Sequence, residues 1–113
     1  MEISVGIDIV EIDKFEKIFK RYGERFINKI FTLSEKEYFK NDVLKMAISF
    51  SLKESVWKAL PEEIQKKFFF KNINIGWKEN KPFLMNKIEN YKFLISFSIS
   101  QNYLITLVFM LRS

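Results

Sequence analysis

Met46-Ala-Ile-Ser-Phe-Ser-Leu-Lys-Glu-Ser-Val-Trp-Lys-Ala-Leu60 is the stretch that decides the fold. Plotted at 100° per residue, the stretch predicts a helix, and residues spaced by three, four and three positions lie on one stripe of it. The residues of this stripe are Ala47, Phe50, Glu54 and Trp57. The stripe places a carboxylate where a core-facing apolar side chain is expected. An ionised carboxylate is costly to bury unless a cation, a metal ion or dense hydrogen bonding compensates it.

Two interpretations of Glu54 are open from this stretch alone. In the first, Glu54 and Lys58 form an i,i+4 ion pair on a solvated face, a contact that stabilises a helix by about 0.3 kcal/mol. In the second, Glu54 either faces a cleft or a subunit edge or has a charged partner elsewhere in the fold. Lys53 beside it and Lys58 one turn beyond it supply positive charge in either case.

The composition predicts one small globular domain over residues 1–113. The chain has 113 residues, 48% hydrophobic content and 13 phenylalanines, enough for a modest core and a surplus of apolar surface, which favours an oligomer. The formal net charge of +5 suits an acidic partner. The lysines are scattered and do not alternate with exposed aromatics, so we expect no nucleic acid as partner.

The sequence contains no cysteine and no histidine, which excludes thiol nucleophiles, Ser-His-Asp catalysis and imidazole metal sites. An enzyme built from this chain must use carboxylates, lysines, hydroxyls and a hard cation such as Mg2+. The chain shows no signal segment and no run of about 18 apolar residues that would span a membrane. We therefore expect a cytoplasmic protein that does not enter a membrane.

The segment Ile3–Val10 alternates as a strand with one wholly apolar face. Asp8 lies on the opposite face, although aspartate is depleted in strands. Gly6, two residues earlier on the face of Asp8, leaves room for a ligand or a backbone to approach closely. An alternative role for Asp8 is to cap the helix that follows the strand.

The rest of the chain predicts an α+β fold, with three helices packed on a mainly antiparallel sheet that the first strand joins. Thr32 and Glu35 form a predicted capping box, and Gly23 is expected to break the first helix. The predicted helices are 11–30, 32–40 and 43–60, and the predicted strands are 68–77, 83–85, 91–100 and 103–111, the last two joined by a turn at 101–102. Under this arrangement Asp8 meets Glu54, and two carboxylates can hold a divalent cation through oxygen. The neighbouring lysines then suit a phosphate-handling site.

Five segments in order along the chain resemble the motifs of the holo-acyl-carrier-protein synthases, the small bacterial 4'-phosphopantetheinyl transferases. The segments are Gly6-Ile-Asp-Ile-Val-Glu-Ile-Asp-Lys14, Phe31-Thr-Leu-Ser-Glu35, Phe50-Ser-Leu-Lys-Glu-Ser-Val-Trp-Lys-Ala59, Asn80-Lys-Pro82 and Phe97-Ser-Ile-Ser100. Each is weak alone, but their order and their span over nearly the whole chain are specific.

The resemblance implies Mg2+-dependent transfer of the phosphopantetheine arm of coenzyme A to a serine of acyl carrier protein, releasing adenosine 3',5'-bisphosphate. It implies that Asp8 and Glu54 hold the metal ion and that Glu54, directly or through a water molecule, is the base for the serine. Lys58 would neutralise the phosphates, with Lys53 as a helper.

The resemblance also implies contacts outside this cluster. Ser100 and Gln101 would contact coenzyme A, and Lys14, Lys17 and Arg21 would dock the acidic carrier protein. The family is typically a homotrimer with sites between subunits, so a homotrimer is expected here.

The chain departs from the family pattern at three places. Leu60-Pro-Glu-Glu-Ile64 replaces a glycine-rich turn that offers amides to the nucleotide, Ser49 stands where an arginine is common, and Gln101-Asn102-Tyr103 replaces a longer hairpin with a histidine. An alternative function is therefore a catalytically silent relative that binds carrier protein as a scaffold.

Overall fold

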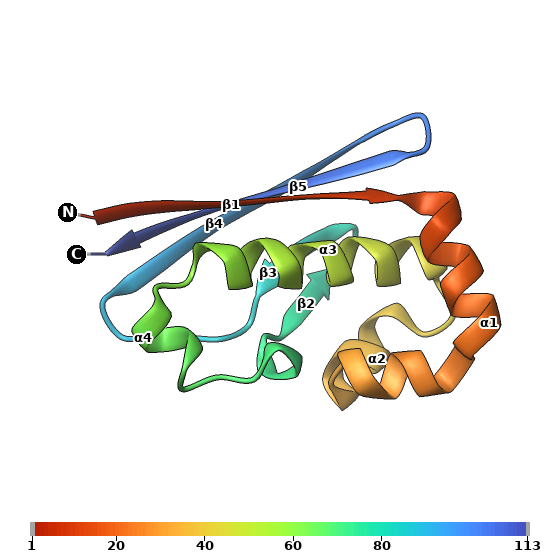
Figure 1. Cartoon of the computed structure of the whole chain (residues 1–113), viewed down its shortest axis with the longest axis horizontal. Coiled ribbons are helices and arrows are strands. Elements are labelled where there is room, and N and C mark those ends of the chain that lie inside the picture. Colours follow the sequence, from red (N-terminus) through yellow and green to blue (C-terminus); the bar gives the residue numbers. More distant parts are fainter. Residues whose placement is uncertain (1, 113) are drawn as a thin grey trace.

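Helix α3 (Val43–Ala59) lies at the centre of the computed structural model, which describes residues 2–112 (Figure 1). Asp42 caps its start by accepting a hydrogen bond from the Lys45 N–H at 3.1 Å, and the helix ends before Pro61. This confirms the helix that the sequence predicts from residue 43 to about residue 60.

The burial of α3 corrects the predicted core stripe. Small and apolar side chains surround this helix, so from Met46 to Ala59 only Phe50, Glu54, Trp57 and Lys58 are not fully buried. The stripe with Glu54 is therefore the most open face of α3, although Phe50 and Trp57 still pack partly against the core. In a helix that is covered on nearly all sides, the spacing of apolar residues no longer predicts which face points to the core.

One face of a three-stranded antiparallel sheet packs on α3. The strand order is β1 (Glu2–Glu11), β5 (Tyr103–Arg112) and β4 (Tyr91–Ser100), and the central pairing places Asp8 opposite Thr106. The two-residue turn at Gln101 joins β4 to β5, as the sequence predicts. The three long strands and the joining of the first strand to this sheet are confirmed.

The two faces of the sheet differ in an unusual way. Toward α3, β1 presents Gly6 and Asp8, and β5 presents buried residues such as Thr106. On the opposite face, the apolar side chains of β1 are exposed, with relative exposures of 45–63%: Ile3, Val5, Ile7 and Ile9. The apolar side of β1 therefore points away from the core of its own chain.

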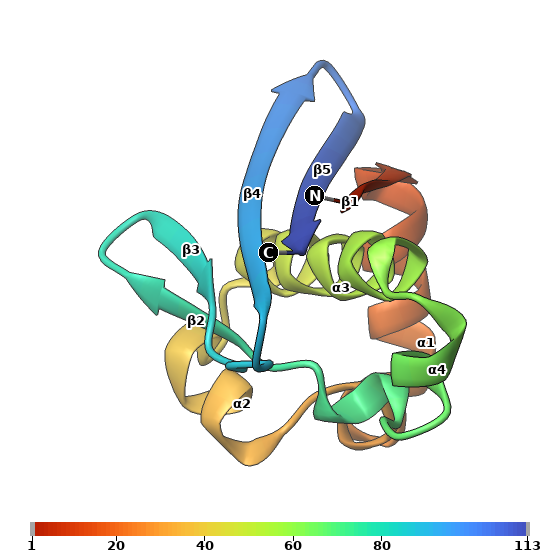
Figure 2. The ribbon, with the colours of Figure 1, turned by 90° about the vertical axis from the view of Figure 1, so that its left-hand side faces the viewer.

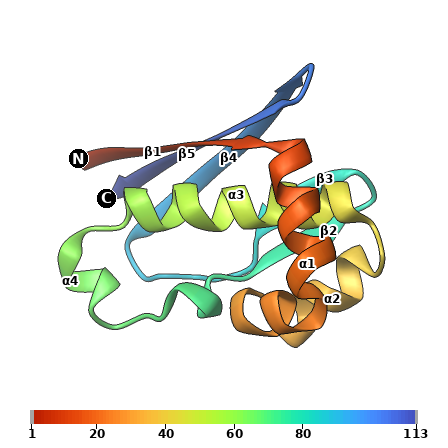
Figure 3. The same cartoon turned by 45° about the vertical axis from the view of Figure 1, so that its right-hand side comes forward.

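Helices α1 (Ile12–Ile30) and α2 (Leu33–Phe39) pack at one end of α3 (Figure 3). Gly23 interrupts α1 as expected, because its φ of 51° and ψ of −131° are not helical, and a second helical stretch follows it directly. The capping box of α2 is confirmed, because the Glu35 N–H donates to Thr32 Oγ1 at 3.2 Å and the Thr32 N–H donates to Glu35 Oε1 at 2.9 Å.

The segment between α3 and β4 is less regular than predicted (Figure 2). It contains α4 (Glu62–Gln65), the 3-10 turn η1 (Phe70–Asn72) and a separate hairpin of β2 (Ile75–Lys78) and β3 (Lys81–Leu84). The predicted strand 68–77 is thus wrong in its first seven residues, because the carbonyl groups of Lys71 and Ile73 bind a lysine ammonium rather than a neighbouring strand.

The helices lie against a mainly antiparallel sheet, and the predicted α+β fold class is confirmed. Among the helices within residues 2–112, none is both long enough and apolar enough to cross a bilayer.

Candidate active site

Gly6 brings strand β1 against helix α3. A Cβ atom at this position would lie 1.8 Å from the backbone carbonyl oxygen of Ser55, so only glycine permits the approach. The space that the sequence left for a ligand or a backbone is therefore filled by the backbone of α3. Asp8, two residues later on the same face, is carried to the surface of the same helix.

Both carboxylate oxygens of Asp8 have partners. Lys58 Nζ donates to Asp8 Oδ1 at 3.0 Å and to the Ile7 carbonyl at 3.0 Å, and Ser51 Oγ donates to Asp8 Oδ2 at 2.8 Å. The start of α1 is capped from elsewhere, because the Asp13 N–H donates to Asn102 Oδ1 at 3.0 Å. The Asp8 side chain thus contacts α3, and the alternative that it caps α1 is wrong.

Glu54 is half-buried on α3, one turn before Lys58. Burial raises the pKa of Glu54 above its ordinary value, the Asp8 carboxylate raises it further, and the Lys58 ammonium opposes both effects. Lys58 forms its ion pair with Asp8 and not with Glu54, so the i,i+4 pair on a solvated face is not formed. The structure thus brings Asp8, Glu54 and Lys58 together between β1 and α3, as the sequence predicts.

Two carboxylates near each other repel, and a hard cation that takes an oxygen from each relieves the repulsion. The donor set of Asp8 and Glu54 therefore fits Mg2+, which prefers carboxylate and water oxygens. Within residues 2–112, no cluster of three or more His, Cys, Asp or Glu side chains is suited to a metal ion. An ion held by this pair would complete its coordination with water or phosphate oxygens, which is how Mg2+ is bound at phosphate-handling sites.

Lys53 does not reach this cluster, which corrects its expected role as a helper in coenzyme A binding. Its side chain is fully buried, and Nζ donates to Glu35 Oε1 at 2.7 Å, to the Lys71 carbonyl at 2.8 Å and to the Ile73 carbonyl at 2.6 Å. Burial lowers the pKa of Lys53, and the Glu35 carboxylate opposes that effect. All three donors of this ammonium are used inside the protein, so none is left for a phosphate.

Glu35 has a second role that the capping box does not reveal. Besides closing the first turn of α2, its Oε2 atom accepts a hydrogen bond from the Ile75 N–H at 2.8 Å, and its side chain is fully buried. The Glu35–Lys53 pair therefore ties α2, α3 and the start of β2 together.

The basic residues of α1 are exposed. Three of them, Lys14, Lys17 and Arg21, are exposed to solvent. The ion pairs found among residues 2–112 do not involve these three side chains. Their charge is therefore free to meet an acidic surface.

Ser100 and Gln101 are exposed at the turn between β4 and β5, away from the carboxylates of the same chain. Ser100 pairs with Tyr103, and Asp8 pairs with Thr106, three residues further along β5, or about 10 Å at the spacing of a strand. One copy of the chain does not bring this turn to the Asp8–Glu54 cluster.

The departures from the family pattern have structural explanations. Glu62 and Glu63 are exposed at the start of α4 and pair with Lys66 at 3.7 Å and Arg112 at 3.8 Å, which neutralises part of their charge. Ser49 is buried, and its hydroxyl accepts a hydrogen bond from Trp77 Nε1 at 2.9 Å, so this position supports the β2 strand rather than a phosphate.

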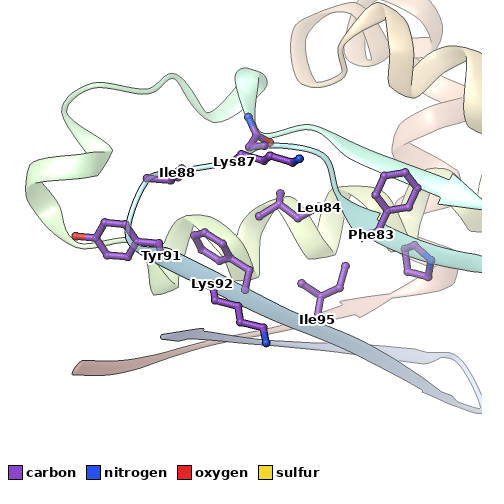
Figure 4. A pocket seen from close by; sticks show the side chains of 10 residues that line it. Phe83, Leu84, Lys87, Ile88, Tyr91, Lys92 and Ile95 are labelled. Atoms are coloured by element: carbon purple, nitrogen blue, oxygen red, sulfur yellow. The ribbon is translucent and has the colours of Figure 1, made fainter. Parts of the chain in front are cut away.

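A hollow of about 450 Å3 lies between β3 and the start of β4 (Figure 4). It adjoins Pro82 of the segment that resembles a family motif, and its wall includes Phe83, Leu84, Lys87, Ile88 and Tyr91. None of Asp8, Glu54 and Lys58 lines it, so it is a separate feature from the carboxylate cluster.

Sequence reasoning missed Ser51, Ser55 and Thr106, three fully buried hydroxyl residues beside Asp8. The available signal was the spacing of the two serines, which puts them on one face of α3, and the single threonine within the apolar strand β5.

The chain matches the model of the 4'-phosphopantetheinyl transferase superfamily over residues 4–108. It belongs to this superfamily. A holo-(acyl-carrier-protein) synthase of Thermodesulfovibrio yellowstonii is 36% identical over 109 residues, which cover 93% of this chain and 95% of the relative. The predicted family and the predicted assignment as a phosphopantetheinyl transferase are therefore confirmed.

Solved structures of the same superfamily share the fold. A Helicobacter pylori holo-(acyl-carrier-protein) synthase in complex with coenzyme A has a TM-score of 0.77 and 31% identity, covering 96% of this chain and 99% of that one. A Bacillus anthracis synthase, described as in complex with CoA (3',5'-ADP), has a TM-score of 0.79 and 26% identity, covering 97% and 96%.

Proposed function

We propose that this phosphopantetheinyl transferase, one domain over residues 1–113, is a Mg2+-dependent holo-acyl-carrier-protein synthase of the cytoplasm. In the reaction, a serine hydroxyl of apo-acyl carrier protein attacks the phosphorus of coenzyme A that carries the pantetheine arm. A new P–O bond forms to the serine, the diphosphate P–O bond breaks, and adenosine 3',5'-bisphosphate leaves. The serine proton passes to the Glu54 carboxylate, directly or through a water molecule.

The single observation that carries the proposal is the cluster of Asp8, Glu54 and Lys58 between β1 and α3. A divalent ion between the carboxylates and the diphosphate would stabilise charge on the leaving group. Lys58, half-exposed on a flexible stem, can move from Asp8 to a phosphate oxygen when substrate arrives.

The basic face of α1 supports docking of an acidic carrier protein. Lys14, Lys17 and Arg21 are exposed on one helix, and complementary charge accelerates the association of protein partners and orients them. The helix starts directly after β1, so a partner bound there lies next to the strand that carries Asp8.

A homotrimer is part of the proposal. The exposed apolar side chains of β1 and neighbouring exposed residues of β5, such as Ile105 and Phe109, are the kind of surface that a second copy of the chain covers. In such an assembly Ser100 and Gln101 of one subunit would contact coenzyme A bound at the carboxylates of the next. Sedimentation equilibrium tests this part, and a stable monomer at micromolar concentration would contradict it.

Mass spectrometry of apo-acyl carrier protein, incubated with the protein, coenzyme A and Mg2+, tests the activity directly. The expected result is a mass gain of one phosphopantetheine that requires Mg2+ and is blocked by EDTA. Carrier protein that binds but gains no mass would contradict the transferase and favour the silent scaffold.

A further inference from the structure

A chain of three buried hydroxyl groups ends on the carboxylate of Asp8. Ser51 Oγ lies 2.8 Å from both Asp8 Oδ2 and Thr106 Oγ1, and Ser55 Oγ lies 2.6 Å from Thr106 Oγ1. All three hydroxyl residues are completely buried. Ser51 and Ser55 are one turn apart on α3, and Thr106 is the residue of β5 that pairs with Asp8, so the chain crosses the junction of β1, β5 and α3.

The chemistry of the groups fixes the direction of these hydrogen bonds. An ionised carboxylate only accepts, so the single hydroxyl hydrogen of Ser51 must point to Asp8. Thr106 then donates to Ser51, through Ser51 Oγ at 2.8 Å or through the Ser51 carbonyl at 3.0 Å. Ser55 in turn donates to Thr106 Oγ1 or to the Thr106 carbonyl at 3.3 Å. Where each hydroxyl donates to the next hydroxyl, the bonds of such a chain strengthen one another.

The two oxygens of Asp8 are held differently. Oδ2 is bound by a hydroxyl inside the core, whereas Oδ1 is bound by Lys58, whose side chain is 49% exposed. An exposed ion pair is weak and its long side chain can leave at little cost, while a buried hydroxyl cannot. Oδ1 is therefore the oxygen that becomes available when a cation displaces Lys58.

The geometry points to Ser51 as a positioning residue that locks the Asp8 carboxylate so that Oδ1 is presented to the metal ion. The inference rests on the proposed function, since it assigns the metal ion to Asp8 and Glu54. A hydroxyl that orients a ligating carboxylate from behind typically changes metal affinity or activity by about 10- to 100-fold when it is removed.

Ser51→Ala and Ser55→Ala form a matched pair, because both remove one buried hydroxyl from the same face of the same helix. Only Ser51 contacts Asp8. The probe is Mn2+, titrated in the presence of saturating coenzyme A and followed by the electron paramagnetic resonance signal of the free ion. We expect the apparent Kd for Mn2+ to rise about tenfold in Ser51→Ala and less than twofold in Ser55→Ala.

A kinetic measurement separates positioning from a general loss of structure. In Ser51→Ala the Mg2+ concentration for half-maximal transfer should rise about tenfold, while kcat at saturating Mg2+ changes less than threefold. Equal shifts in both serine variants, or no shift in Ser51→Ala, would overturn the inference. Should the alanine variant not fold, Ser51→Cys keeps a side chain of similar size with a weak donor, and an unchanged Mn2+ affinity in that variant would overturn it too.

The same titration distinguishes failure of this inference from failure of the proposed function. A wild-type chain that binds no Mn2+ in the presence of coenzyme A contradicts the metal assignment itself, whatever the serine variants do. Tight wild-type binding with no difference between the variants contradicts only the role of Ser51.

Discussion

Helix α3 carries two lysines, five residues apart, that both pair with a carboxylate but in opposite surroundings. Lys53 and Glu35 are fully buried, and the ammonium also binds two backbone carbonyls. Lys58 is 49% exposed, and its partner Asp8 retains 14% exposure. The first pair fastens three parts of the fold together, and the second lies at the open face of the helix beside Glu54.

The two lysines are the same residue type on the same helix and differ in burial. Burial therefore decides which of them can change its partner. A fully buried ammonium with three oxygen partners cannot release any of them without leaving an unpaired charge. A half-exposed ammonium can exchange one partner for another at little cost, because water solvates it during the exchange. Only the second arrangement suits a residue that must meet an incoming phosphate.

The largest effect is expected from breaking the carboxylate pair beside Lys58. Asp8→Asn and Glu54→Gln each remove one anionic ligand of the proposed Mg2+ site and should lower the rate of transfer about 1,000-fold, since a metal ion at this site would supply several kcal/mol of transition-state stabilisation. The fold should survive, because the side chains keep their shapes and each substitution removes one of two neighbouring like charges. Mass spectrometry of carrier protein and circular dichroism measure the two quantities, and a wild-type rate in either variant would refute the metal assignment.

Breaking the buried pair should instead damage stability. Lys53→Ala leaves Glu35 charged and unpaired in the core and should lower the free energy of unfolding by about 3 to 5 kcal/mol. Urea denaturation measures the loss. In the double variant Glu35→Gln/Lys53→Met no buried charge remains, so part of the stability should return. A double variant as unstable as Lys53→Ala would show that charge burial is not the cause.

Lys58→Ala is the counterpart of Lys53→Ala, because it removes the half-exposed lysine of the same helix. Transfer should fall about 100-fold, as for other groups that stabilise charge in a transition state. The free energy of unfolding should change by no more than about 1 kcal/mol, since the Lys58–Asp8 pair is partly exposed and screened by solvent. Stability loss as large as that of Lys53→Ala would remove the distinction between the two pairs.

Lys14 and Lys17 of α1 differ from both of these lysines, because they are exposed and have no ion-pair partner among the described residues. In Lys14→Glu/Lys17→Glu, the KM for carrier protein should rise about tenfold and that for coenzyme A less than twofold, because reversed charge opposes docking of an acidic surface. Lys66→Glu/Lys67→Glu, directly after α4 at the other end of α3 (Figure 1), is the control with the same change in net charge, and it also removes the exposed Lys66–Glu62 pair. Equal effects of both variants on carrier protein would contradict a specific docking face.

The smallest expected effect concerns the pH dependence of stability. The pKa of Glu54 is raised by burial and by Asp8, so ionised Glu54 opposes folding at pH values above its ordinary 4.5. Glu54→Gln should therefore be more stable than the wild type at pH 7, and the difference should shrink as the pH falls toward 4 and Glu54 takes up a proton in the wild type. Urea midpoints at both pH values measure it, and a difference that grows on acidification would contradict the raised pKa.

Local sequence signals predicted most of the elements. The alternation of β1 and β4, the capping box at Thr32 and the short turn at Gln101 each depend on near neighbours, and the structure confirms them. Gly23 likewise interrupts α1 as predicted, because a glycine adopts positive φ at little cost.

The candidate site was only partly accessible from the sequence. Asp8 and Glu54 stand out because each is a carboxylate in a pattern of apolar residues, a signal of local origin. The hydroxyl chain behind Asp8 gave no comparable signal, since Ser51 and Thr106 are 55 residues apart and meet only when β5 lies between β1 and β4.

By itself the sequence determined the family, most of the elements and the two carboxylates of the proposed site, because motifs and periodicity depend on neighbouring residues. Only the tertiary structure decided which lysine is buried and which is open, and that the apolar face of β1 points away from its own core. The physical reason is that burial depends on which segments pack together. Lys53 and Lys58 lie on one helix, but α2 and the segment 71–75 cover only the first.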